Sequence, residues 1–190
     1  MELQQITPER KKGTENFKFD NETLNFKLND FWIWNQSNLI ENRTRGILAE
    51  FIVKKALDIK EGVRIEWDCY DLITENGIKI EIKSAAYIQS WKQKKYSTIQ
   101  FGIAQSVGDP LHVEYDGNIK RWSDFYIFCV LNNKDQETLN PIDLNQWSFY
   151  VLKTEVLNDK IPTQKTIGLN SLLRLNPIKC NFNELKSVIK

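Results

Sequence analysis

The sequence predicts an α/β protein of the α+β type, in which helices flank a central sheet of about five strands. Residues 37–56 place apolar side chains at helical spacing. Residues 70–83 alternate around an Asn-Gly turn, and residues 124–131 and 147–153 are short apolar runs typical of strands. Helix and strand signals therefore occur together in one chain.

The chain is long enough to bury one sizeable core. It has 190 residues, of which 41% are hydrophobic, and it shows no internal repeat or low-complexity linker. We therefore expect a single domain over residues 1–190. Within it we expect a core of about residues 37–153, an aromatic-rich N-terminal segment, 1–36, and a C-terminal appendage, 154–190.

The N-terminal segment is dense in aromatic residues. Residues 17–36 hold four phenylalanines and two tryptophans. Such density is more typical of packing onto a core or of a subunit contact than of base stacking. It indicates no recognition function.

The predicted helix begins after Ser37, a residue type that caps helix N-termini. Its buried stripe is expected to hold Ile40, Ile47, Leu48, Phe51, Ile52 and Ala56. Glu50 lies beside this stripe. It is either a boundary glutamate, solvated or paired with Lys54, or part of a functional site.

The loop of the following hairpin decides which side chains share a face. With a three-residue loop, 75–77, and a left-handed Gly77, Asp71 pairs with Glu81. One face is then apolar and the other carries Asp71, Lys79, Glu81 and Lys83. A two-residue turn would pair Leu72 with Glu81 and mix the faces, so the longer loop is favoured.

Two carboxylates beside a lysine on one hairpin are suited to a divalent cation. Mg²⁺ or Mn²⁺ takes one or two carboxylates and keeps waters for substrate oxygens. Asp71 and Glu81 would supply the carboxylates, together with the backbone carbonyl of Ile82. Asp68 points away from Glu81 in this register unless a β-bulge intervenes. Lys83 would hold or help deprotonate an attacking water, or neutralise charge on phosphorus.

These residues resemble the PD-(D/E)xK nuclease superfamily over roughly residues 37 to 131. The resemblance rests on Asp71, the triplet Glu81-Ile82-Lys83, the following Ser84 and the upstream helix with Glu50. It implies a restriction-endonuclease-like core with a mixed central β-sheet. It also implies that Asp71, Glu81 and Glu50 bind metal and that Lys83 is catalytic. Tyr70 stands where that family often has proline.

The stretch after Lys83 is basic although the net charge of the whole chain is only +1. Residues 79–95 hold five lysines and one acid, with aromatic residues between them. This pattern suits a nucleic-acid strand gripped by its backbone, although a solvated lysine-rich loop has the same composition. The candidate substrate contacts are Arg45, Ser84, Gln89, Trp91, Lys92, Gln93, Lys94 and Lys95. Gln89 and Gln93 are spaced to share a helical face.

Further strands are predicted at residues 97–104, 124–131 and 147–153. The resemblance implies a crossover helix after the first of these, but residues 105–123 contain Gly108-Asp109-Pro110 and Asp116-Gly117. Both sequences break helices, so a hairpin-like excursion is expected there. A terminal helix is expected near residue 190, with Asn181 or Asn183 as its cap.

Other functional classes find little support. The three cysteines, Cys69, Cys129 and Cys180, have no metal or disulfide spacing. His112 is the only histidine and has no nucleophile motif, which argues against a hydrolase triad. No apolar run reaches membrane-spanning length and no signal peptide is visible, so a cytoplasmic location is expected.

We therefore expect a Mg²⁺-dependent endonuclease that hydrolyses DNA phosphodiester bonds, with a restriction or defence role implied by the resemblance. A homodimer is expected, since each subunit would then address one strand of a duplex. Two alternatives stay open. One is an inactive nuclease fold that binds DNA or another subunit, and the other is a nuclease for RNA or branched DNA.

Overall fold

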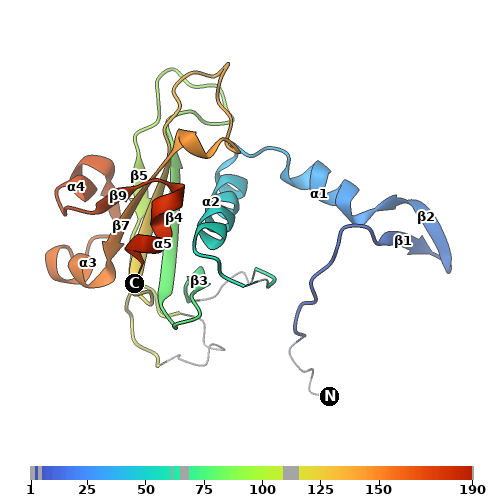
Figure 1. Cartoon of the computed structure of the whole chain (residues 1–190), viewed down its shortest axis with the longest axis horizontal. Coiled ribbons are helices and arrows are strands. Elements are labelled where there is room, and N and C mark those ends of the chain that lie inside the picture. The colour runs from blue at the N-terminus through green and yellow to red at the C-terminus, as the bar shows by residue number, and fades with distance from the viewer. Residues whose placement is uncertain (1–2, 4–5, 61, 65–68, 109–115, 190) are drawn as a thin grey trace. The chain divides into compact units, whose positions relative to one another are not determined.

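The computed structural model describes residues 3, 6–60, 62–64, 69–108 and 116–189. Its α-helices are α1 (Leu28–Gln36), α2 (Asn42–Ala56), α3 (Thr154–Lys160), α4 (Leu169–Leu173) and α5 (Leu185–Val188). Its strands are β1 (Asn16–Phe19), β2 (Glu22–Lys27), β3 (Leu72–Ile73), β4 (Lys79–Ala86), β5 (Gln100–Gly102), β6 (Phe125–Leu131), β7 (Trp147–Lys153), β8 (Thr166–Gly168) and β9 (Ile178–Cys180). The 3₁₀ turns η1 (Leu144–Gln146) and η2 (Phe182–Glu184) complete the regular structure (Figure 1).

The chain divides into two compact units, one of residues Met1–Asn38 with Glu61–Glu66 and one of Leu39–Lys60 with Trp67–Lys190. The smaller unit contains the hairpin β1–β2 and the helix α1. Asp20 and Asn21 both have positive φ, of 46° and 66°, as a tight two-residue hairpin turn requires. The single-domain assignment stays a prediction.

The larger unit is built on a five-stranded mixed sheet in the order β3-β4-β6-β7-β9. β4 and β6 run parallel, and the other neighbouring strands run antiparallel. β6 reads FYIFCVL, and its last six residues are all buried. A strand that is apolar on both sides lies in the middle of a sheet whose two faces are covered. The predicted fold class is confirmed.

Helices cover both faces of this sheet. On one face α2 and α5 pack on alternate residues of the strands, including Ile80, Ile82 and Ile127. On the other face Leu157 of α3 and Leu172 of α4 join the second core cluster. The result is a helix–sheet–helix arrangement of three layers (Figure 1).

The hairpin of β3 and β4 has the predicted register. Leu72 pairs with Ile80 and Ile73 pairs with Lys79, as predicted. Asp71 directly precedes β3, and its N–H donates to the Ile80 carbonyl at 3.0 Å, so the predicted pairing of Asp71 with Glu81 lies beyond the paired residues. Gly77 has a φ of +80° and its N–H donates to the Thr74 carbonyl. The three-residue loop is therefore confirmed, and alternation on β4 follows from it.

The helix that carries Glu50 starts later than predicted. α2 begins at Asn42, and the Glu41 carboxylate accepts hydrogen bonds from the N–H groups of Arg43 and Thr44. Ser37 instead ends α1. The predicted stripe was also partly wrong, because Phe51 is 54% exposed. The buried face of α2 contains Thr44, Arg45, Ala49, Ile52 and Val53.

The third predicted strand does not join the central sheet. Within residues 97–104 only β5 forms, and it pairs with β8 in a separate two-stranded sheet. The fifth strand of the central sheet is β9, from the predicted C-terminal appendage. That segment is part of the core, since Leu157, Leu172 and Leu185 are fully buried. Asn181 does cap, but it caps η2, by accepting from the N–H groups of Asn183 and Glu184, while the terminal helix α5 follows Glu184 without a side-chain cap.

The connection from β4 to β6 also departs from the expected helical pattern. Residues 87–99 form no helix, so Gln89 and Gln93 do not share a helical face. Ser106 and Lys120 pair through two backbone hydrogen bonds, as expected for a hairpin-like excursion. Asp68, His112 and the Asp109-Pro110 part of the predicted turn lie outside the described residues.

None of the helices in the described part of the chain combines the length and apolar character needed to cross a membrane.

Candidate active site

Asp71, Glu81 and Lys83 come together on the β3–β4 hairpin. Asp71 lies directly before β3 and is joined to β4 by two hydrogen bonds, from its N–H to the Ile80 carbonyl and from the Ile82 N–H to its carboxylate. Lys83 follows Glu81 on the same face of β4 because strand side chains alternate. The ammonium group of Lys83 donates a hydrogen bond to the Glu81 carboxylate. Strand alternation thus places Glu81 beside Lys83, and the hydrogen bond from the Ile82 N–H brings Asp71 to the same strand.

The carboxylate of Asp71 is held by the backbone. Its Oδ2 accepts a hydrogen bond of 2.6 Å from the N–H of Ile82. Burial, followed by the negative charges of Glu81 and Glu50, raises the pKa of Asp71 to about 7. The N–H of Ile82 and the charge of Lys83 oppose this shift without cancelling it. Negative charge is thus gathered here at a cost in free energy, which a cation would relieve.

The same negative charges that favour the neutral form of Asp71 favour the charged form of Lys83. Burial acts to lower the pKa of Lys83, but Glu81, Asp71 and Glu50 outweigh burial and raise that pKa. The ammonium form is therefore stabilised by the three carboxylates. A charged lysine beside two carboxylates suits the stabilisation of an anionic transition state.

Glu50 reaches this cluster from α2. Its charge acts on both Asp71 and Lys83, although it lies on a different element. Glu50 is half-buried at the side of the helix that faces the sheet, next to the fully buried Ala49. The charge of Glu50 is therefore felt at Asp71 and Lys83, while its place in the site stays a prediction.

Tyr126 is a neighbour of the site that the sequence did not indicate. It is paired with Glu81 across the parallel strands β4 and β6, and it is only 4% exposed. Burial and then the charge of Glu81 raise the pKa of its hydroxyl. Within FYIFCVL it looks like one more apolar residue. Only the pairing of β6 with β4, two strands separated by 38 residues, brings it next to Glu81.

Arg45, Ser84 and Gln89 belong to a buried network instead of an open surface. Arg45 is 3% exposed and Gln89 is 9% exposed. The guanidinium donates to Ser84 Oγ at 3.3 Å, to Gln89 Oε1 at 3.2 Å, to Asn42 Oδ1 at 2.8 Å and to the Ile40 carbonyl at 2.9 Å. Burial lowers the pKa of Arg45. These contacts tie α2 to β4 one residue beyond Lys83.

The remaining predicted substrate contacts lie on the loop after β4. Trp91 is 53% exposed, and Lys92, Lys94 and Lys95 are also exposed. Gln93 is half-buried, and its amide supports the loop by accepting from the Gln89 N–H at 2.7 Å and donating to Ser97 Oγ at 3.0 Å. The lysines are thus available to a ligand, while Gln93 shapes the loop that carries them.

The donor set fits a divalent cation that keeps part of its hydration shell. Among the residues that the structure describes, no three His, Cys, Asp or Glu side chains gather closely enough to enclose a metal ion. Asp71, which accepts from the Ile82 N–H, and Glu81, which accepts from Lys83, nevertheless provide two carboxylates on one hairpin. Mg²⁺ is usually bound by one or two carboxylates with several waters, so a partial ligand set matches its chemistry.

Comparison with known proteins gives one family. A family model described as bacteriophage T4 endonuclease IV matches residues 5–171. This range includes Glu50, Asp71, Glu81 and Lys83, together with α1, α2, α3 and the first part of α4. A search of curated proteins gives no match to this chain.

Proposed function

The chain belongs to the bacteriophage T4 endonuclease IV family, and from that premise we propose that it is a metal-dependent endonuclease that hydrolyses DNA phosphodiester bonds. We further propose that its active site is of the PD-(D/E)xK type. One observation carries this proposal. The β3–β4 hairpin carries Asp71, Glu81 and Lys83, and burial, followed by the negative charges of Glu81 and Glu50, raises the pKa of Asp71 to about 7.

In this proposal Asp71, Glu81 and the carbonyl of Ile82 hold Mg²⁺ or Mn²⁺, and Glu50 completes the site from α2. The cation, when bound, would lower the pKa of a bound water and polarise the phosphate. Asp71 is kept in place by the N–H of Ile82. Glu81 orients the ammonium of Lys83 by accepting its hydrogen bond.

Lys83 acts on the substrate side of the site. Its ammonium donates to the attacking water or to the phosphoryl oxygen on which negative charge grows. Attack in line with the scissile bond would release the 3′ oxygen as leaving group. Tyr126 covers one side of Glu81 and keeps it partly away from bulk water, which strengthens the Glu81–Lys83 interaction.

Three further parts of the proposal follow from the resemblance and from symmetry. A homodimer would allow two such sites to cut both strands of a duplex. A restriction or defence role and a cytoplasmic location would suit an enzyme of this kind. Sedimentation of the full chain with and without a DNA duplex measures whether the protein forms a homodimer.

The test is cleavage of supercoiled plasmid with Mg²⁺ or Mn²⁺ by the wild type, Lys83→Ala and Asp71→Asn. Cleavage that both substitutions abolish supports the proposal. Glu75→Gln is the matched control, because Glu75 is an exposed carboxylate in the loop of the same hairpin. Asp68→Asn tests the alternative acid directly. Loss of cleavage in Asp68→Asn but not in Asp71→Asn would refute the assignment of Asp71.

The same variants separate the alternatives. Wild-type protein that binds plasmid, single-stranded DNA, RNA or a junction without cutting any of them would be a binding protein with an inactive nuclease fold. Cleavage confined to RNA or to junctions would change the proposed substrate class and leave the proposed active site unchanged. In either active case Lys83→Ala is expected to reduce the rate by about 10²- to 10³-fold.

A further inference from the structure

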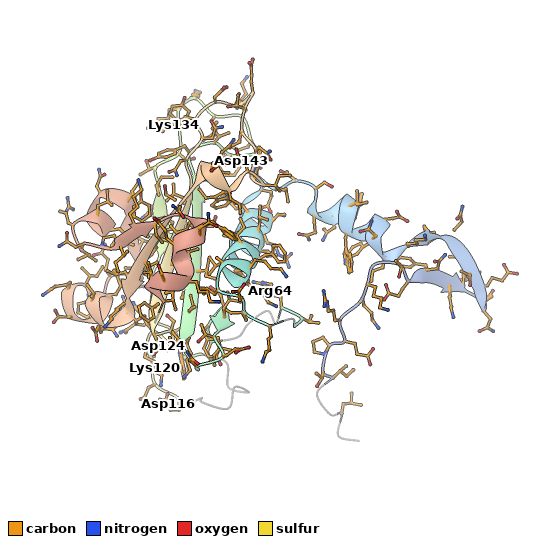
Figure 2. All side chains as sticks on the ribbon, in the orientation of Figure 1. Arg64, Asp116, Lys120, Asp124, Lys134 and Asp143 are labelled. Atoms are coloured by element: carbon orange, nitrogen blue, oxygen red, sulfur yellow. The ribbon has the colours of Figure 1, made fainter. Side chains whose placement is uncertain are left out.

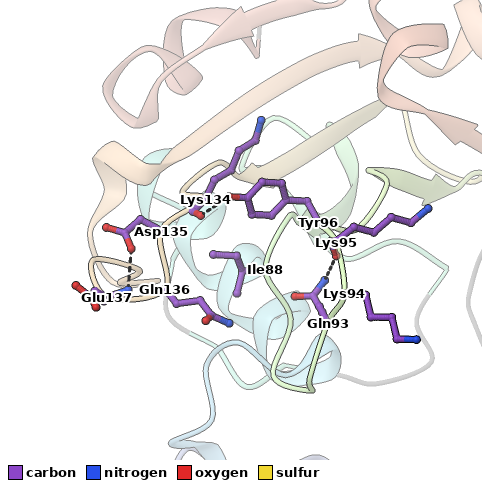
Figure 3. A pocket seen from close by; sticks show the side chains of 9 residues that line it. All are labelled: Ile88, Gln93, Lys94, Lys95, Tyr96, Lys134, Asp135, Gln136 and Glu137. Atoms are coloured by element: carbon purple, nitrogen blue, oxygen red, sulfur yellow. Dashed lines mark hydrogen bonds between the residues drawn. The ribbon is translucent and has the colours of Figure 1, made fainter.

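A pocket of about 630 Å³ opens where β4 and β6 end. Residues 93–96 line one side, residues 134–137 line the other, and the buried Ile88 lies between them (Figure 3). The two walls are about forty residues apart in sequence, and the parallel pairing of β4 with β6 brings them together. Its volume is in the range of pockets that hold small molecules or single nucleotides.

Lys134 is fixed at this pocket by aromatic residues. Its Nζ lies 4.3 Å from the ring centroid of Tyr87 and 5.7 Å from that of Tyr96. The Tyr96 hydroxyl donates a hydrogen bond of 2.9 Å to the carbonyl of Lys134 (Figure 3). A lysine held in this way has lost part of the rotamer freedom that weakens exposed lysines as anion binders.

The charges around the pocket favour an anion. Lys94, Lys95 and Lys134 are all exposed at its rim. Asp135 is committed to its own loop, where its carboxylate accepts from the Glu137 N–H and from the Thr138 hydroxyl, both at 3.0 Å. Three ammonium groups are thus opposed by two carboxylates, Asp135 and Glu137, and the pocket residues carry one more positive than negative charge.

The position of Lys134 determines which part of a nucleic acid, the base or the phosphate, the pocket could bind. Because its ammonium lies over the ring of Tyr87, a base could stack on that face only by displacing the lysine. Ammonium groups are compact point charges that suit phosphate oxygens. The pocket therefore suits the charged backbone of a strand more than the identity of a base.

The pocket also lies along the same strand as the proposed active site. From Lys83 to Ala86, β4 advances about 10 Å, and Ile88 follows two residues later. Lys134 is at the end of the sheet opposite Asp124 (Figure 2). A DNA strand with its scissile phosphate near Lys83 would meet the pocket a few nucleotides away, at about 3.4 Å per nucleotide of a duplex.

We propose that this pocket binds a backbone phosphate of the DNA strand a few nucleotides from the cleaved bond, with Lys134, Lys95 and Lys94 as the contacting residues. The proposal rests on the proposed function for the DNA itself. Lys134 and the wall 134–137 were not indicated by the sequence, where residues 132–146 look like an ordinary polar loop.

The experiment measures binding without cleavage. Full-length Lys83→Ala protein in EDTA is titrated against fluorescein-labelled 16-nucleotide single strands and 16-base-pair duplexes at several salt concentrations. In this background Lys134→Gln and Lys95→Gln are each expected to weaken binding about 3- to 10-fold, equally for different sequences. Each is expected to lower the slope of log K against log salt by about 0.7 to 0.9. Glu137→Gln is expected to strengthen binding.

Lys160→Gln provides the matched control, since Lys160 is an exposed lysine of α3 that pairs with its neighbour Asp159. It should leave both the affinity and the salt slope unchanged. An oligonucleotide with one neutral methylphosphonate linkage tests the phosphate itself. When that linkage is moved along the strand, one position should lose the same affinity as Lys134→Gln, and combining the two should cost no more than either alone.

The outcomes distinguish this proposal from the proposed function. Unchanged affinity and salt slope in Lys134→Gln and Lys95→Gln, in a protein whose wild type cuts DNA, would overturn the pocket and leave the active site standing. If Lys134→Gln and Lys95→Gln lose affinity and salt slope as expected but the wild type cuts no DNA, the phosphate-binding pocket is supported and the proposed catalysis is overturned. Displacement of the Lys134-dependent binding by millimolar inorganic phosphate at matched ionic strength would assign the pocket to a free anion and overturn the DNA contact.

Discussion

Oδ2 of Asp71 accepts a hydrogen bond of 2.6 Å from the backbone N–H of Ile82. The paired residues of β3 begin only at Leu72, so this side chain extends the hairpin by one more bond. Asp71 therefore contributes both to the hairpin and to the candidate site. It supports β4 next to Glu81, and it brings a carboxylate into a site where two others already repel it.

Asp71→Asn is expected to abolish cleavage and to stabilise the metal-free protein above pH 7. The pKa of Asp71 is about 7 when folded and 3.8 in its ordinary state, so the folded state holds an extra proton between these values. The resulting stability is complete below about pH 4 and is lost as pH rises through 7. At pH 8 asparagine removes the buried charge but keeps an acceptor for Ile82, which should add about 1–3 kcal/mol.

Urea denaturation in EDTA at pH 5 and pH 8 checks this expectation. The gain of Asp71→Asn over wild type should be larger at pH 8 than at pH 5, whereas Asp71→Ala should gain less because the Ile82 N–H loses its acceptor. The exposed control Glu75→Gln should show no such pH dependence. A variant Asp71→Asn that is less stable than wild type at pH 8 would contradict the charge repulsion described here.

Divalent metal is expected to stabilise the wild type most at alkaline pH, where Asp71 is ionised. At a concentration of Mg²⁺ one hundred times its dissociation constant, the gain is about 2.7 kcal/mol. Thermal unfolding with EDTA, Mg²⁺ and Mn²⁺ at pH 6 and pH 8 measures it. Glu81→Gln should abolish the metal-dependent shift, and a shift that survives this substitution would place the metal elsewhere.

Arg45→Met is expected to destabilise the protein by about 2–4 kcal/mol, because the acceptors around the guanidinium would be buried without their donor. The exposed Arg43→Gln, on the same turn of α2, should change stability by no more than about 0.5 kcal/mol. Chemical denaturation gives both values. Equal effects of the two substitutions would show that the network around Arg45 does not hold α2 on β4.

Glu50→Gln and Glu41→Ala separate metal binding from helix stability on one helix. Glu41 caps α2 by accepting from two N–H groups, so its loss should cost about 1 kcal/mol of folding free energy. Glu50→Gln should instead weaken metal binding by about 10-fold while leaving the unfolding free energy in EDTA unchanged or higher. Calorimetric titration with Mn²⁺ compares them. A Glu50→Gln variant with wild-type metal affinity would remove Glu50 from the site.

The hairpin could be predicted from the sequence because its determinants are local. Gly77 permits the left-handed loop residue, and the alternation of Ile78, Ile80 and Ile82 fixes the register that pairs Leu72 with Ile80. β6 and β7 were equally clear, because their apolar runs are long and bounded by polar loops. For each of these elements, the sequence pattern that predicts it is local to the element and its flanking loop.

Features that depend on distant partners were missed. β5 pairs with β8 across more than sixty residues, and β9 completes the central sheet from the C-terminal segment. Arg45 was predicted to contact the substrate because it is charged, but it lies in the buried stripe of α2. Four acceptors satisfy it there, two at or just before the start of α2 and two on the stretch from Ser84 to Gln89. Tyr126 became a neighbour of Glu81 only through the pairing of β6 with β4.

The continuity of β4 has a consequence for what the enzyme would release. Glu81 and Lys83, the Arg45 partner Ser84, and the floor of the pocket at Ile88 all follow one another along this single stretch of chain. A rigid strand would fix the distance between the phosphodiester bond that is cut and the phosphate that the pocket binds. Fragments too short to span that distance should escape further digestion, so an exhaustive digest would end at a minimum product length that shortens when Lys134 is replaced.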